Sequence, residues 1–444
     1  MYRLTLAKLD GQSAGTWRSG GAASGGRHAA AVDRQTLWVC VERGKENRDV
    51  SVFRRGLNAS AAVAAMAMCA SCALAGPAWA KHGPKAGPPA GSDFTTIATG
   101  LDNPRDLEFG PGGLYVAEAG HGGEPGSKEC LPGPTGETEC IGFTSGISTI
   151  DASGQHHRVL TGLFSLAPPS GFAATGVDGV SVRGRGTLFG IVTGASDLLQ
   201  GPATENLAPA TLAAARAQAG RLIQVNPSGR YKVVADVGHF DFQWSAEHKE
   251  LVPEQFPDAN PYNVLSEPGR NWVVDAASNT LDEVRANGSI SVVAFIPNPA
   301  RSDAVPTCVD RGPDGAFYIG QLTGFGNGPG KAAVWRVVPG LPPEEWATGL
   351  TAVTGCGFGS DGQFYATEFS TLGWENASPE HGAETGAVVR VPAHSTSPTV
   401  IAEKLSFPGG FAAGPDGAIY VSNWSIAPAN SGGGPTGEVV RIVP

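Results

Sequence analysis

The sequence is poor in charged residues and in the residue types of a helical protein. Charged residues make up 16% of its 444 residues, aromatic residues make up 8%, and methionine occurs three times. Glycine and proline are abundant instead, with 63 and 34 residues, about 22% of the chain against a usual total of about 12%. Hydrophobic residues make up 41%, which is enough for a core and argues against global disorder. This composition favours turns and short strands and disfavours a helical bundle.

Several motifs of catalytic and cofactor sites are absent from the sequence. It has no G-x-S-x-G nucleophile elbow, no G-x-G-x-x-G between a strand and a helix, and no H-x-H or H-E-x-x-H spacing. A hydrolase triad, a dinucleotide site and a zinc protease therefore lack a basis in the sequence. No C-x-x-C pair lies beyond residue 80, so a thiolate zinc site is not expected there.

Residues 54–80 have the features of a secretory signal peptide. Arg54 and Arg55 precede a small apolar run, and an A-W-A cleavage site ends at Ala80. A transmembrane helix and a buried helix are the alternatives, but the run is short for a membrane span. Residues 1–53 are interpreted as an upstream leader, which is either a disordered segment or the product of a start codon placed too early; Val50 and Val52 are the other candidate starts. Residues 81–93 are a short linker to a folded domain over residues 94–444.

Cleavage after Ala80 would leave an acidic exported protein, periplasmic or extracellular. It would keep 36 acidic and 21 basic residues, a net charge near −15. Without a basic patch, nucleic acid and anionic membrane surfaces are not expected as partners, and no membrane span remains. We expect a monomer whose partner is an unidentified small molecule or exported protein.

One short pattern recurs six times in residues 94–444. It is a glycine-containing turn followed by a short apolar and aromatic strand, which usually ends in a polar residue. Four clear copies begin at residues 110, 312, 359 and 414, and two weaker copies begin at residues 184 and 269. Flanking strands bring each unit to about four antiparallel strands. The sequence therefore predicts an all-β fold, a six-bladed β-propeller with four-stranded antiparallel blades.

The last unit stops after its third strand, so its fourth strand must come from another part of the chain. Residues 94–99 (FTTIAT) precede the first complete unit. We predict that this N-terminal strand completes the last blade, because pairing the two ends closes the ring and removes an exposed sheet edge.

Three insertions lengthen individual units. They are residues 120–145, which carry Cys130 and Cys140; residues 201–219, which are Ala-rich and are predicted to form one short helix; and residues 238–260, which are aromatic and acidic. Such loops often set ligand specificity, and they can equally be solvated decoration. Both interpretations stay open at this point.

Five stretches resemble a known family. They are residues 98–123 (ATGLDNPRDLEFGPGGLYVAEAGHGG), 260–264 (NPYNV), 273–281 (VVDAASNTL), 304–325 (AVPTCVDRGPDGAFYIGQLTGF) and 359–368 (GSDGQFYATE). Through them, residues 94–444 resemble the ScyD/ScyE family of exported propellers, which is related in plan to NHL-repeat and streptogramin-lyase-like propellers. The resemblance implies an exported propeller and no settled reaction. Val192 departs from the pattern, because the other units have a polar residue at this strand end.

Polar side chains at the repeated strand ends are candidate metal ligands. In a propeller, equivalent strand ends surround one axis, so Glu118, Asp275, Glu368, Asn423 and Gln321 could converge. Their oxygens suit Ca²⁺ or Mg²⁺. The alternative is structural, because such a side chain commonly hydrogen-bonds the adjacent turn.

A second set of candidates lies where the innermost strands begin. Arg105, Asp106, Tyr262, Thr307 and the strand-end Gln321 could bind a ligand at the channel mouth. The alternative for the first two is an Arg–Asp pair that locks neighbouring blades.

The four cysteines beyond residue 80 suggest disulfides in an exported chain. Cys130 and Cys140 flank a ten-residue loop and are predicted to pair. Cys308 and Cys356 begin adjacent inner strands and are offset by one position. Because strand side chains alternate, they could face each other across a blade boundary, and otherwise they are small buried hydrophobes.

Two functions are compatible with the sequence. The first is an exported binding or scaffold propeller that holds a small molecule or protein at its channel face. The alternative is a divalent-metal-assisted hydrolase or lyase of the streptogramin-lyase or lactonase type that uses the channel mouth. No catalytic residue can be assigned, and no cofactor is expected beyond Ca²⁺ or Mg²⁺. One propeller plan hosts many activities, so the fold alone does not choose between them.

Overall fold

A computed structural model describes residues 94–133, 136–226, 228–251, 257–299, 303–324, 328–377, 383–426 and 436–444. The predicted leader, signal peptide, cleavage site at Ala80 and linker lie outside the described residues. No helix in the described part combines the length and apolar composition needed to cross a membrane.

Six antiparallel sheets form the six predicted blades, each listed from its innermost to its outermost strand. Blade 1 consists of β2 (Pro104–Gly110), β3 (Gly113–Glu118), β5 (Thr138–Ile150) and β6 (His156–Ala167), with β4 (Cys130–Pro132) added to β5. Blade 2 consists of β7 (Val177–Arg183), β8 (Thr187–Val192), β9 (Arg221–Val225) and β10 (Tyr231–Asp236). Blade 3 consists of β11 (Pro261–Glu267), β12 (Arg270–Asp275), β13 (Thr280–Arg285) and β14 (Ile290–Phe295).

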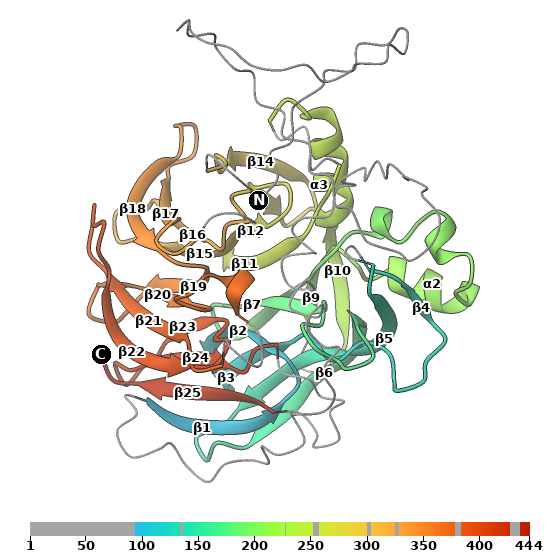
Figure 1. The fold of residues 1–444 in the computed structure, drawn as a ribbon, viewed down its shortest axis with the longest axis horizontal. Coiled ribbons are helices and arrows are strands. Elements are labelled where there is room, and N and C mark those ends of the chain that lie inside the picture. The colour runs from blue at the N-terminus through green and yellow to red at the C-terminus, as the bar shows by residue number, and fades with distance from the viewer. Residues whose placement is uncertain are drawn as a thin grey trace, which may run out of the picture. The chain divides into compact units, whose positions relative to one another are not determined.

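The remaining three blades follow the same order. Blade 4 consists of β15 (Pro306–Arg311), β16 (Phe317–Gln321), β17 (Ala332–Val337) and β18 (Glu344–Leu350). Blade 5 consists of β19 (Val353–Phe358), β20 (Phe364–Glu368), β21 (Gly386–Val391) and β22 (Thr399–Leu405). Blade 6 consists of β23 (Phe411–Ala413), β24 (Ile419–Asn423), β25 (Gly437–Ile442) and β1 (Phe94–Leu101). The inner strands contact one another in the cyclic order β2, β7, β11, β15, β19 and β23, and they gather at the centre of Figure 1.

The ring closes as predicted, by the pairing of β1 with β25. Phe94 lies opposite Ile442, and Leu101 lies opposite Gly437. The hydroxyl of Thr96 donates to the Glu438 carboxylate (2.8 Å), 342 residues away in the sequence. Blade 6 is therefore made from both ends of the folded domain, and its outer strand lies at the rim in Figure 1.

The recurring turn owes its sequence to a small hydrogen-bonded unit. In blade 4, the Asp314 carboxylate accepts from the Tyr318 hydroxyl (3.2 Å) and pairs with Arg336 (2.7 Å). Gly315 has a φ of 79°, in the left-handed region that glycine adopts without a steric cost. The same aspartate–tyrosine bond recurs in the turns of blades 5 and 6, at Asp361 and Tyr365 and at Asp416 and Tyr420.

The described residues of the insertions contain two α-helices. The predicted short helix is α2 (Pro209–Arg216), next to two 3₁₀ turns, η3 (Ser196–Leu198) and η4 (Pro202–Thr204). A third 3₁₀ turn, η5 (Trp374–Asn376), lies in blade 5. The second helix, α3 (Val237–Glu247), was not predicted, and the expectation of one helix is corrected. The Asp236 side chain accepts the His239 N–H and caps the start of α3.

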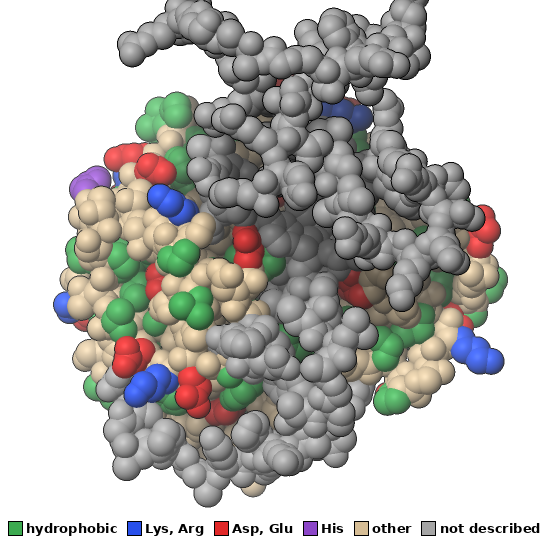
Figure 2. Space-filling view, in the orientation of Figure 1, with side chains coloured by type: hydrophobic (Ala, Val, Ile, Leu, Met, Phe, Trp, Pro, Cys, Tyr) green, Lys and Arg blue, Asp and Glu red, His purple; other side chains and the backbone are tan. Residues whose placement is uncertain are grey.

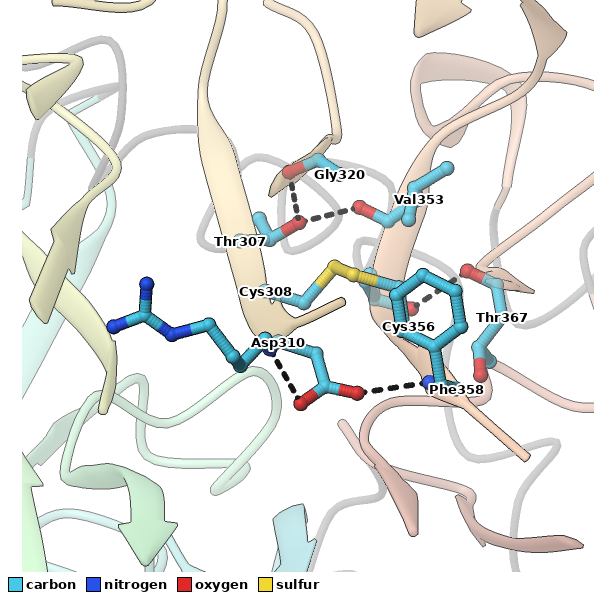
Figure 3. The surroundings of a disulfide bond; sticks show 10 residues. Thr307, Cys308, Asp310, Gly320, Val353, Cys356, Phe358 and Thr367 are labelled. Atoms are coloured by element: carbon cyan, nitrogen blue, oxygen red, sulfur yellow. Dashed lines mark hydrogen bonds between the residues drawn. A yellow bond between two sulfur atoms is a disulfide. The ribbon is translucent and has the colours of Figure 1, made fainter. Parts of the chain in front are cut away.

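The predicted disulfide between Cys130 and Cys140 is present, and so is the possible one between Cys308 and Cys356. Cys130 and Cys140 join β4 to β5. Cys308 on β15 and Cys356 on β19 join the inner strands of blades 4 and 5, with Cα atoms 5.7 Å apart (Figure 3). The second bond is buried among apolar side chains of both blades.

Candidate functional site

The three insertions leave the propeller at one end, which we call the mouth end. It is the end at which inner strands begin and second strands finish. The described residues of 119–137 and 193–220 lie between the second and third strands of blades 1 and 2, and those of 237–260 lie between β10 and the inner strand β11. Antiparallel connectivity places all of these connections at the mouth end.

The insertions are bonded to one another and form one lobe over blades 1 to 3. The Ala208 N–H donates to the Glu129 carboxylate (2.9 Å), which links the second insertion to the first. His239 Nδ1 on α3 lies 3.0 Å from Asp197 Oδ2, which links the third insertion to the second. Figure 1 shows α2, α3 and β4 on the same side of the blades. We call these three joined segments the insertion lobe.

An apolar cluster lies where the loops of the other blades meet at the mouth end. Its buried members come from the loops around blades 2 to 6 and from the start of β11 and contact one another, so the cluster lies near the propeller axis. They include Phe172, Tyr262, Val305, Phe369, Phe407 and Ile426.

The strand-end polar residues hydrogen-bond the backbone of their own blades. In four blades, the side chain accepts the N–H of a residue just before the inner strand. The pairs are Glu118 with Asp102 (2.7 Å), Asp275 with Asn260 (2.9 Å), Glu368 with Thr351 (2.8 Å) and Asn423 with Ser406 (2.7 Å). Gln321 accepts from the Trp335 indole instead (2.6 Å). This recurring bond explains why the second strand ends in a carboxylate or an amide in these four blades.

These residues are not gathered into one set of ligands in this structure. All five are buried, and they lie in separate blades with a backbone or indole donor on each side chain. Among the described residues, no group of three or more His, Cys, Asp or Glu side chains is arranged to hold a metal ion. The donor set predicted for Ca²⁺ or Mg²⁺ therefore does not fit the ion.

Glu368 provides a test of this backbone-capping role. Glu368→Gln retains an oxygen for the Thr351 N–H, whereas Glu368→Leu leaves this buried donor unpaired. We expect the leucine variant to lose about 2 kcal/mol of unfolding free energy and the glutamine variant to lose almost nothing, measured by urea unfolding at pH 7. Burial raises the pKa of Glu368 to about 7, so glutamine should match or exceed the wild type at pH 8. Equal losses in both variants would contradict the capping role.

The predicted channel residues join neighbouring blades. Arg105 Nε lies 3.2 Å from Asp178 of blade 2, and its Nη2 donates to the Ala174 carbonyl (2.6 Å). The Thr307 hydroxyl donates to the Val353 carbonyl of blade 5 (2.7 Å). Tyr262 is buried in the apolar cluster. Ligand binding by these residues stays a prediction, and the observed contacts lock adjacent inner strands.

Acidic side chains of the inner strands serve the same purpose. Asp106 accepts the Val180 N–H (3.1 Å), and Glu108 accepts the Val182 N–H (2.9 Å) of the next blade. Asp310 accepts the Phe358 N–H (2.8 Å) across the blade boundary in Figure 3. Burial raises the pKa of Asp106 to about 8 and that of Glu108 to about 7. The anticipated Arg105–Asp106 pair is therefore replaced by two separate contacts with blade 2.

Asp275 belongs to a buried group of three carboxyls that the sequence did not reveal. The Asp241 side chain on α3 lies within hydrogen-bonding reach of Asp275 and Asp282. Neither Asp241 oxygen has a hydrogen-bond donor among the described residues. Burial and the charges of its two neighbours raise the pKa of Asp241 well above its ordinary value. We call these three residues the aspartate cluster.

His121 is the second feature that sequence reasoning missed. It follows β3 at the start of the first insertion, and its Nδ1 lies 2.5 Å from Asp102 Oδ2. Asp102 precedes β2, so the pair sits at the mouth end of blade 1. The hydrogen bond to Asp102 raises the pKa of His121.

The face in Figure 2 shows acidic and basic side chains interspersed over its described surface.

Comparisons with known proteins show no family. No family model and no curated protein matches the chain, so the ScyD/ScyE resemblance stays a prediction. Among solved structures, a virginiamycin B lyase from Staphylococcus aureus is 17% identical over 56% of this chain, with a TM-score of 0.32, and the match spans 63% of its own length. A streptogramin B lyase is 11% identical over 78% of this chain and 95% of its own, with a TM-score of 0.38. A gluconolactonase from Xanthomonas campestris is 8% identical over 79% and 89%, with a TM-score of 0.44. Likenesses this weak carry no argument about function, and the propeller fold rests on the sheets themselves.

Proposed function

We propose that this protein is an exported binding propeller that holds a small molecule at the mouth end, between the insertion lobe and the apolar cluster. The insertion lobe carries the proposal, because three segments from different blades are bonded together on one side of the mouth. An apolar surface beside a few fixed polar groups is the usual composition of a small-molecule site. His121 and the His239–Asp197 pair supply such polar groups.

Export is part of the proposal and is supported by the two disulfides. Disulfides form and persist in oxidising compartments outside the cytosol. Both bonds lie in the domain that would remain after cleavage at Ala80. The signal peptide over residues 54–80 and the domain boundary at residue 94 belong to the same proposal.

The alternative function, a divalent-metal-assisted hydrolase or lyase, is less well supported, because its predicted metal ligands make other contacts. Glu118, Asp275, Glu368 and Asn423 each hold a backbone N–H, as described above. A hydrolytic activity would therefore need a different chemical group at the mouth end.

A ligand screen read out by amide exchange tests the binding function. The purified chain is screened by thermal shift against a library of small organic metabolites, and each hit is mapped by hydrogen–deuterium exchange. A compound at ten times its Kd should add about 1.4 kcal/mol of stability. It should also slow amide exchange in residues 119–130, 193–220 and 237–251.

Two exposed side chains at opposite ends provide matched variants. His239→Ala alters the insertion lobe and should weaken binding, whereas Arg285→Ala, at the turn end of β13, should leave binding unchanged. A library without a single stabilising compound would contradict the proposed function. Hits that protect only the turns opposite the mouth end would contradict it as well.

A further inference from the structure

The loop that carries His121 is held in one conformation by its flanking glycines. Gly120 and Gly122 have φ angles of 77° and 70°, in the left-handed region that side chains disfavour. A Cβ atom on Gly120 would lie 2.6 Å from the backbone nitrogen of Ser145, and one on Gly122 would meet backbone atoms equally closely. The His121 N–H donates to Thr144 Oγ1 (2.9 Å). The backbone therefore fixes where the imidazole can lie.

A buried carboxylate sets the orientation of this imidazole. Asp102 is only 3% exposed, and its Oδ2 contacts His121 Nδ1. The other oxygen, Oδ1, has no hydrogen-bond donor in the described part of the chain. Since a carboxylate accepts hydrogen bonds, the neutral imidazole carries its proton on Nδ1. Nε2 is then left with a lone pair that can accept a proton.

Nε2 of His121 points toward an accessible side of the loop. The His121 side chain is 18% exposed, and its Nε2 lies 3.7 Å from Oε1 of Glu124, which is 79% exposed. Neighbouring hydroxyls are already engaged, because Thr144, Ser145 and Ser165 donate to backbone carbonyls. A reaction at Nε2 would therefore use water as its nucleophile.

Two other His–Asp pairs show what sets this one apart. His157 pairs with Asp151 (3.4 Å), and His239 pairs with Asp197 (3.0 Å). Their imidazoles are 62% and 52% exposed, and neither histidine lies between two glycines. Of the three His–Asp pairs in the described part of the chain, only the His121 pair joins a buried carboxylate to a loop locked by left-handed glycines. Such a fixed orientation is what proton transfer requires and what a surface ion pair does not need.

We propose that His121 is a general base, with Asp102 as its positioning residue, that hydrolyses a carboxylic ester at the mouth end. This activity goes beyond the proposed binding function. Nε2 takes a proton from a water molecule, and the water oxygen forms a bond to the ester carbonyl carbon. The bond between that carbon and the alkoxy oxygen then breaks. The leaving alkoxide takes the proton from Nε2, which yields an acid and an alcohol and restores the imidazole.

The available groups select an ester over more demanding substrates. A single imidazole can both activate water and protonate a leaving alkoxide. An amide would leave as a much stronger base, and a phosphate ester would need cationic groups around its oxygens. No basic side chain among the described contacts of His121 supplies such a charge.

The experiment measures ester hydrolysis by the full chain, with p-nitrophenyl acetate and dihydrocoumarin as probes. We expect multiple turnovers above the buffer rate and a kcat/KM that rises with pH through one ionisation. His121→Gln should lower kcat/KM by about 100-fold or more. Asp102→Asn should lower the rate and also lower the apparent pKa of the profile, because the carboxylate stabilises the protonated imidazole.

His157→Gln is the matched control. Its rate should stay within about twofold of the wild-type rate, because a loss of about 100-fold is expected only when the general base itself is removed. No turnover of either probe would overturn the proposal. Equal rates in His121→Gln and the wild type, or equal losses in His121→Gln and His157→Gln, would overturn it too. If His121→Gln does not fold, the pH profile decides: an unchanged apparent pKa in Asp102→Asn would overturn the role of the pair.

Discussion

Replacing both Cys308 and Cys356 with alanine is expected to lower the free energy of unfolding by about 4 kcal/mol. The bond closes a loop of 48 residues, and a cross-link of that span removes much conformational freedom from the unfolded chain. It also joins inner strands of two blades, so no local opening can relieve its loss. Urea unfolding under non-reducing conditions measures the change.

The other disulfide serves as the internal comparison. Cys130 and Cys140 are separated by only 10 residues, for which the same relation gives about 3 kcal/mol at most. They hold β4, a three-residue strand of the insertion lobe, which can open while the blades stay folded. The Cys130→Ala, Cys140→Ala variant should therefore lose less stability. An equal or greater loss than in the inner-strand variant would contradict this account.

Asp241→Asn is expected to stabilise the protein by about 3 kcal/mol at pH 8, which is the worth of one or two hydrogen bonds to charged groups. In the wild type, three buried carboxyls face one another. When they lose their protons at high pH, their negative charges repel, and no hydrogen-bond donor among the described residues contacts the Asp241 oxygens. An asparagine amide can donate to Asp275 and Asp282 without any proton uptake. The variant thus keeps the contact and removes one buried charge.

The pH dependence of stability follows from the same cluster. Burial raises the folded-state pKa values of Asp241, Asp275 and Asp282, so the folded state keeps protons that the unfolded state releases above about pH 4. The stabilising contribution is complete below that pH and is lost as the pH rises through the raised values. Unfolding free energy should therefore fall between pH 5 and 8, and Asp241→Asn should flatten this slope. The other charged groups near α3 form two ion pairs, between His239 and Asp197 and between Arg221 and Asp236.

Urea unfolding at pH 5.5 and pH 8 tests both parts of this prediction. Glu247→Gln is the control, because Glu247 is an exposed residue at the end of the same helix. It removes an equal charge from α3 without touching the cluster and should leave the slope unchanged. A less stable Asp241→Asn at pH 8, or one that retains the wild-type slope, would contradict the proton-sharing account.

The propeller could be predicted because short repeated sequence segments determine most of its turns and strands. The turns of blades 4, 5 and 6 each need their own glycine, aspartate and tyrosine, as Asp314 and Tyr318 show, so the pattern is clear in the sequence of these blades. The closure by residues 94–99 followed from counting strands. The hydrogen-bonding role of the strand-end residues was harder to predict, because the sequence places Glu118 and Glu368 at strand ends but the donors they bind are backbone groups that carry no sequence signal.

The candidate site was harder to predict because its partners are distant and ordinary. Asp102 lies 19 residues before His121, and although both lie in the stretch 98–123, nothing in that stretch marks them as a pair. The two glycines beside His121 are the one local sign of a constrained loop. Asp241 lies in α3, and the aromatic and acidic sequence of this insertion did not predict a helix. Its contact with Asp275 depends on how α3 packs against blade 3. Insertions have no repeat to guide prediction, so their tertiary contacts became visible only in three dimensions.

The closure of blade 6 also sets the order of events during biosynthesis. β1 is the first strand of the domain to be made, and its partner β25 is among the last, with Thr96 and Glu438 342 residues apart. At a synthesis rate of 5–20 residues per second, β1 would wait roughly 20–70 s for its partner. The hydrogen-bonding edge of β1 stays open for that time, so the nascent chain is exposed to wrong pairing until β25 is made.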